Sequence, residues 1–125
     1  MTPVEGPDGA ATVMAVTAEP DGLVRLTWQA GVRITGPVAA AAMARVDELN
    51  GDEENPLLVV MAGTGELTRE ARMVFATRCS ASRIALLGSS AVDRVLANFA
   101  LGVRSQPVPT RFFTDEDAAL EWLRR

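Results

Sequence analysis

Residues 56–88 constrain the fold of this chain more than any other stretch. They contain two apolar runs, residues 57–61 and 84–87, separated by a glycine loop and an amphipathic segment over residues 68–82. Both runs are continuously apolar, which is typical of central strands covered on both faces. A strand, a helix and a second strand in this order nearly always form a right-handed parallel crossover. The sequence therefore predicts an α/β protein with parallel central strands.

The chain length and composition fit one such domain. The chain has 125 residues, of which 48% are hydrophobic, enough for a single packed core. Residues 1–11 are rich in Pro, Gly and Asp and are expected to be a flexible lead-in to a domain over residues 12–125. The net charge of −4 argues against a general nucleic-acid surface.

The residue types that are missing exclude several classes of chemistry. All 12 basic residues are Arg, and the chain has no Lys, His or Tyr and one cysteine, Cys79. Ser-His-Asp and Cys-His catalysis, a P-loop, Schiff-base chemistry and a His- or Cys-based zinc site are therefore excluded. We expect no cofactor and no metal, and we expect Cys79 to be a small buried hydrophobe.

Several features of the sequence bear on where we expect the protein to be located. The first residues lack the basic and then apolar pattern of a signal peptide, and no apolar run reaches membrane-spanning length. A single cysteine also cannot form an internal disulfide. We expect a cytoplasmic protein with no integral membrane segment.

The rest of the chain supplies the elements that complete a sheet with helices. Two strands over residues 12–19 and 23–28 flank a Pro-Asp-Gly turn and predict a hairpin. A helix over residues 36–50, capped by Thr35, precedes an acidic connector over residues 52–55, for which we expect no further role. Thr68 is the expected N-cap of the second helix.

Three elements make up the carboxyl-terminal third. A helix follows residue 90, and its Asn98 is either solvent-facing or a specific polar contact. A last strand over residues 110–113 leads to a helix opened by Thr114 and Asp117, a near capping box. The predicted order is β-β-α-β-α-β-α-β-α.

The terminal stretch, residues 111–123, which reads RFFTDEDAALEWL, resembles the ending of SpoIIAA-like proteins, also called the STAS or STAS/SEC14-like family. The strand over residues 83–88 and the helix after it resemble the preceding elements of that family. The resemblance covers most of the chain from Val13 onward and implies a STAS fold, a mixed sheet with parallel central strands and packed helices.

One segment departs from the family pattern. Anti-sigma-factor antagonists of this fold carry Asp-Ser-Ser-Gly at the start of the second helix, where a partner kinase phosphorylates a Ser. This chain has Thr68-Arg69-Glu70-Ala71 at that place. Arg69 occupies the phospho-acceptor position and Thr68 the position of the Asp, so the resemblance predicts the fold without the usual phosphorylation switch.

Two helix starts are candidate binding surfaces. Thr68 is either a phosphosite, with Arg69 and Arg72 nearby, or a plain N-cap. The second helix start, at Ser89 and Ser90 with Arg94 one turn further on, either binds an anion or only caps its helix. Thr64, in the Gly-Thr-Gly loop, either approaches a ligand or forms a turn. The complete candidate surface for a partner or an anion is Thr64, Thr68, Arg69, Glu70, Arg72, Ser89, Ser90 and Arg94.

Three functions are open at this point. The first is a non-enzymatic regulatory module in bacterial signalling that binds a protein partner and forms a homodimer through residual apolar surface at Val103, Phe112 or the first hairpin. The alternative is a binding domain for a small lipid-like or nucleotide-like ligand, which the SEC14-like relatives suggest. The third is an enzyme that uses Asp and Glu, with Glu66 and Glu70 as the residues to change.

Overall fold

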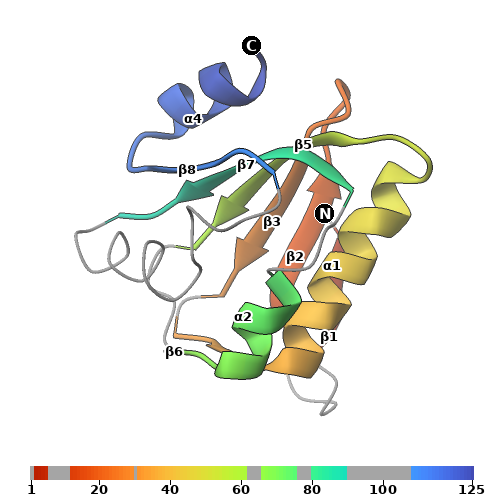
Figure 1. Cartoon of the computed structure of the whole chain (residues 1–125), viewed down its shortest axis with the longest axis vertical. Coiled ribbons are helices and arrows are strands. Elements are labelled where there is room, and N and C mark those ends of the chain that lie inside the picture. The colour runs from red at the N-terminus through yellow and green to blue at the C-terminus, as the bar shows by residue number, and fades with distance from the viewer. Residues whose placement is uncertain (1, 6–11, 30, 62–65, 76–79, 90–107) are drawn as a thin grey trace.

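The computed structural model describes residues 2–5, 12–29, 31–61, 66–75, 80–89 and 108–125 (Figure 1). Some of the predictions concern residues outside these ranges. They are the third helix after residue 90 and the side chains of Thr64, Cys79, Ser90, Arg94, Asn98 and Val103.

Two parallel strands lie at the centre of the structure. β5 (Asn55–Val60) pairs in parallel with β7 (Ala81–Leu87), and Leu57 lies opposite Ile84. Leu57 and Val59 pack into the core on one face of the sheet, while Leu58 packs into a second core on the other face. The prediction of doubly covered parallel strands is confirmed.

These strands belong to a six-stranded mixed sheet with the order β1-β2-β3-β5-β7-β8. β2 (Thr12–Ala18) and β3 (Val24–Trp28) form the predicted hairpin, and β8 (Thr110–Phe113) is the predicted last strand. The pairs β3–β5, β5–β7 and β7–β8 are parallel. The sheet is therefore antiparallel on the side of the amino terminus and parallel elsewhere.

Helices cover the two faces of the sheet unequally (Figure 1). α1 (Gly36–Asn50) and α2 (Arg69–Phe75) pack side by side on one face, over the larger core. α4 (Glu116–Leu123) lies on the opposite face, where its Ala119 and Leu123 are buried. Each layer closes one side of the same central strands.

The sequence of α1 explains both of its ends. Thr35 has an extended backbone, and its side-chain oxygen accepts a hydrogen bond from the Val38 amide at 3.4 Å. Pro37 lies in the first turn, where its missing N–H leaves no helical bond unmade. Gly51 ends the helix with φ of 59°, a value that L side chains rarely adopt. α1 therefore spans the residues predicted for it.

Three small elements differ from the prediction. Thr2–Glu5 is a strand, β1, antiparallel to β2, so this part of the expected lead-in belongs to the sheet. Pro3 fits there because β1 is an edge strand of the sheet. β4 (Arg33–Ile34) and β6 (Glu66–Leu67) form a separate two-stranded parallel ladder. Such two-residue strands are too short to produce a periodic pattern.

Two element boundaries and one surface prediction also need correction. Ala81 and Ser82 lie in β7 rather than in the second helix, because β7 begins at Ala81, where its ladder with β5 starts. Asp115 caps α4 instead of Thr114, because its carboxylate accepts the Ala118 amide at 3.0 Å. Phe112 is buried in the core and so offers no apolar surface for self-association.

A buried amide network joins the carboxyl end of α1 to the starts of β5 and β7. The Asn50 side chain donates to Ser80 Oγ at 2.8 Å and accepts from Asn55 Nδ2 at 3.0 Å. Ser80 Oγ donates in turn to Asp47 Oδ1 at 2.6 Å. Asn50 is 6% exposed, so these bonds replace the water it has lost. Asn55 therefore has a structural role, contrary to the prediction for its connector.

The first hairpin turn packs against this network through Gly22. Gly22 has φ of 93°, and a Cβ at this position would lie 2.8 Å from Asn55 Oδ1. The nitrogen of the same amide is bonded to Asn50, so Asn55 cannot move away without disturbing that bond.

We predict that Gly22→Ala lowers the free energy of unfolding more than Gly31→Ala. Gly31 is a matched control, because its φ is 76° but no atom lies within 4 Å of an added Cβ. We expect Gly31→Ala to lower the free energy of unfolding by about 1–2 kcal/mol, because an L side chain disfavours the positive φ. Gly22→Ala carries a similar backbone cost and, in addition, its Cβ disturbs Asn55. Urea denaturation of both variants measures the difference. Equal losses would contradict the role assigned to the contact with Asn55.

Candidate functional site

The short β4–β6 ladder brings the starts of α1 and α2 together. The Thr68 amide donates to the carbonyl of Ile34 at 3.0 Å, directly before each helix begins. Across this junction, a Cβ added to Gly36 would lie 2.9 Å from Cβ of Glu70. The glycine therefore permits α2 to begin against the first turn of α1, and Glu70 lies at that contact.

Thr68 is the N-cap of α2, as predicted. Its hydroxyl accepts a hydrogen bond from the Ala71 amide at 3.2 Å, and its side chain is only partly exposed. This bond satisfies one of the amides that the first turn leaves without a helical partner. Thr68 as a phosphate acceptor stays a prediction.

The two arginines of α2 are exposed beside this cap. Ala71 is fully buried, and Val74 and Phe75 pack against the core. Because these three residues define the inward side of the helix, Arg69 lies on the outward side, and Arg72 lies next to it. Both arginines are exposed. The result is a positively charged surface on a helix that the core holds in place.

Ser89 lies at the same edge of the sheet. It is exposed and directly follows the end of β7, while α2 follows the end of β5 and β6. The Met61 amide donates to the Leu87 carbonyl at 2.9 Å, so the two strands end together. Of the candidate surface, the structure thus places Thr68, Arg69, Glu70, Arg72 and Ser89 where parallel strands end, the usual working edge of α/β folds.

Two exposed residues at this surface were missed by the sequence reasoning. Arg33 lies in β4, next to the start of α1, and Met73, on α2, is 65% exposed. A methionine four residues after Arg69 falls on the same outward side of the helix. The helical spacing of Met73 and Arg69 was the available signal. The two-residue strand that contains Arg33 is too short to give any signal in the sequence.

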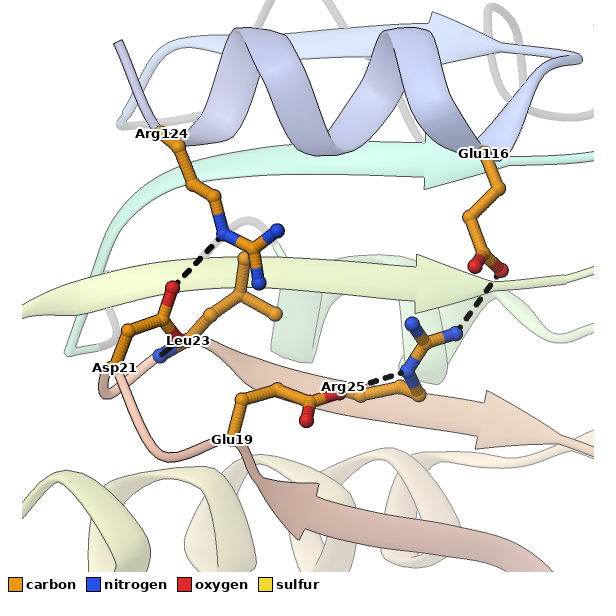
Figure 2. Close-up of polar contacts among 6 residues, drawn as sticks. All are labelled: Glu19, Asp21, Leu23, Arg25, Glu116 and Arg124. Atoms are coloured by element: carbon orange, nitrogen blue, oxygen red, sulfur yellow. Dashed lines mark hydrogen bonds and ion pairs between the residues drawn. The ribbon is translucent and has the colours of Figure 1, made fainter.

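A second set of charged residues lies on the other face of the sheet, between the first hairpin and α4 (Figure 2). Arg25 contacts Glu116 at 3.1 Å and Glu19 at 3.5 Å. The hydrogen bond to Glu116 is the main cause of a raised Arg25 pKa. At the other end of α4, Arg124 contacts Asp21 Oδ2 at 2.8 Å. Both ends of α4 are therefore tied to the hairpin.

Asp21 is the acid of this set whose pKa is lowered. The main cause is the hydrogen bond from the Leu23 amide, and Arg124 lowers the pKa further (Figure 2). Both contacts favour the charged carboxylate over the protonated form.

Two more arginines contact aromatic rings on this face. Arg83 donates to the Trp122 carbonyl at 2.8 Å and lies 5.0 Å from the centre of its ring. Arg111 lies 5.3 Å from the centre of the Phe113 ring. These contacts add cation–π attraction beside the α4 core.

Comparison with known proteins gives a family and a fold. Residues 16–125 match the model of a family described as Domain of unknown function (DUF7793). A protein of unknown function from Arthrobacter sp. FB24 is 55% identical, with 88% of this chain and 98% of that chain covered, and a TM-score of 0.37. No curated protein matches the chain.

Two more distant solved structures share the fold. An anti-sigma factor antagonist from Mycobacterium paratuberculosis has a TM-score of 0.63 at 14% identity, over 98% of this chain and 100% of that chain. An uncharacterized DUF3478-family protein from Shewanella loihica PV-4, described as having a SpoIIAA-like fold, has a TM-score of 0.61 at 15% identity, over 88% and 91%. The predicted resemblance is confirmed at the level of the fold.

None of the helices in the described ranges is long and apolar enough to cross a membrane.

We predict that Asp21→Asn reduces the loss of stability in acid. The folded-state pKa of Asp21 lies below its ordinary value of 3.8, so the unfolded chain binds more protons as the pH falls. The stabilisation from Asp21 is present above the unfolded pKa and is lost as the pH falls through the folded pKa. Urea denaturation between about pH 6 and pH 3 measures this slope.

The control for this prediction is Asp117→Asn, which removes an exposed carboxylate in the first turn of α4, at the opposite end of that helix from Arg124. This variant reports the effect of losing a negative charge alone. If the free energy of unfolding of Asp21→Asn falls as steeply with decreasing pH as that of the wild type and the control, Asp21 does not contribute to the loss of stability in acid.

Proposed function

The chain belongs to the DUF7793 family, and we propose that it is a non-enzymatic regulatory module of bacterial signalling that acts by binding another protein. The observation that carries the proposal is the exposed start of α2, with Arg69 and Arg72 at the edge where parallel strands end. The fold is shared with a protein described as an anti-sigma factor antagonist, which supports a regulatory role.

The charge of this surface suggests the chemistry of the partner. Arg69 stands where the related antagonists carry a phospho-acceptor Ser, so the surface is permanently positive at a position that phosphorylation makes negative in those proteins. Arginines bind carboxylates through paired hydrogen bonds. We therefore propose an acidic surface on the partner and a binding step that does not depend on phosphorylation of residue 69.

The same proposal covers assembly and location. We place the module in the cytoplasm, where signalling regulators of this kind act, and we propose that it is a homodimer. The single cysteine, which cannot form an internal disulfide, supports the location. An enzymatic activity that is lost when Glu66 or Glu70 is changed would overturn the proposal that the protein is not an enzyme.

We predict that Arg69→Glu/Arg72→Glu abolishes partner binding without unfolding the chain. Both side chains are exposed, so the reversal changes the surface charge and leaves the core intact. Affinity capture from the native cell, followed by identification of the captured proteins, measures the effect. We expect the wild type to retain a signalling regulator, such as a kinase or a sigma-factor regulator, and the variant to lose it.

The matched control is Arg111→Glu/Arg125→Glu, which reverses two exposed arginines on β8 and after α4. It makes the same change in net charge away from α2. Capture of the same regulator by the wild type and both variants would show that the α2 surface is not the binding site.

A further inference from the structure

The outward side of the α1–α2 pair carries opposite charges at its two ends. Arg69 and Arg72 lie on α2, which begins beside Gly36 at the first turn of α1. Asp52 and Glu53 are exposed after the last turn of α1, beside Glu48, which is exposed in that turn and pairs with Arg45 at 2.8 Å. α1 has 15 residues, so the two ends are separated by roughly 20 Å along the helix.

The middle of this face is apolar. Ala40 and Ala44 are exposed on α1, one turn apart, and Met73 is 65% exposed on α2. A large exposed hydrophobic side chain on α2 and small exposed side chains on α1 favour contact with another helix, because small side chains let two helix backbones approach.

This arrangement is complementary to itself. A two-fold axis near the middle of α1 would turn a second copy end for end, so that an isologous contact forms. The arginines of each copy would then face the acidic end of the other, and the apolar middle would face itself. Both ends of the contact would be attractive at once, whereas a parallel arrangement would place like charges together.

We propose that the outward face of α1 and α2 binds a second copy of this chain in an antiparallel dimer. The proposal names a partner for the α2 surface and so rests on the proposed function, in which that surface is a docking site. A heterologous partner that uses Arg69 and Arg72 would then compete with the second copy. Self-association thereby regulates access to the same arginines.

The test uses two charge-reversed full-length chains and a measurement of mass. One variant is Arg69→Glu/Arg72→Glu and the other is Asp52→Arg/Glu53→Arg. Light scattering after size exclusion is expected to give twice the 13.3 kDa chain mass for the wild type and the single chain mass for each variant alone. Each reversal places like charges at both ends of the contact and should weaken association by at least ~10-fold.

Mixing the two variants provides the decisive result. In the mixed pair, the carboxylates introduced at positions 69 and 72 of one chain would face the guanidinium groups introduced at positions 52 and 53 of the other. The remaining end of the contact would keep its native charges, so a dimer should form again. Circular dichroism checks that each variant is folded. Met73→Asp should also give a monomer, whereas reversal of Arg111 and Arg125 should leave the dimer intact.

The outcomes separate this inference from the proposed function. A monomeric wild type, dimeric reversal variants, or a mixture that stays monomeric would overturn the dimer. If the wild type is monomeric while its α2 arginines still select a signalling regulator in capture, only the dimer fails. If the dimer behaves as described and no regulator depends on these arginines, the proposed function fails and the dimer stands.

Discussion

The parallel pairing of β5 with β7 is the interaction on which the other elements depend. Leu57, Leu58 and Ile84 bury their side chains on the two faces of these strands, so the pair contributes to both cores. Burial of such side chains stabilises a fold by about 1.5–3 kcal/mol each. The strand pair holds the helical layers in place because each layer packs on one of its faces.

Different interactions hold the two helical layers on the sheet. α1 and α2 cover a larger apolar cluster, and their starts are joined by the Thr68–Ile34 hydrogen bond. α4 covers a smaller cluster and is tied at both ends by arginine contacts to the hairpin and to β7. Surface ion pairs add little individually, so α4 depends on several weak contacts. The layer that carries the proposed docking face is the better packed one.

The sequence predicted the elements whose signals are long. The continuous apolar runs of β5 and β7 and the capped α1 were recognisable because many residues agree in each. The two-residue ladder of Ile34 and Leu67 was missed, because pairing between distant short segments leaves no periodic pattern. The cap of α4 was shifted by one residue, since Thr114 and Asp115 are both good caps and only the backbone decides between them.

The candidate surface was only partly predictable. Arg69 and Arg72 were found from their place at a helix start, but the contact between Glu70 and Gly36 depends on how two helices meet. Asn55 is a second residue whose contacts could not be predicted from the sequence. It was expected to lie in a solvated connector, and only the folded chain reveals that its amide bonds to Asn50. Local sequence identifies caps and cores, whereas contacts between elements require the tertiary fold.

Hydrogen exchange of the backbone amides in the native protein tests the central role of β5 and β7 most directly. Amides that open only on global unfolding exchange most slowly. We predict that the slowest amides lie in β5 and β7, over residues 57–60 and 84–87, and that those of α4 and β1 exchange faster through local opening. Amides of β5 and β7 that exchange as fast as those of α4 would contradict the account.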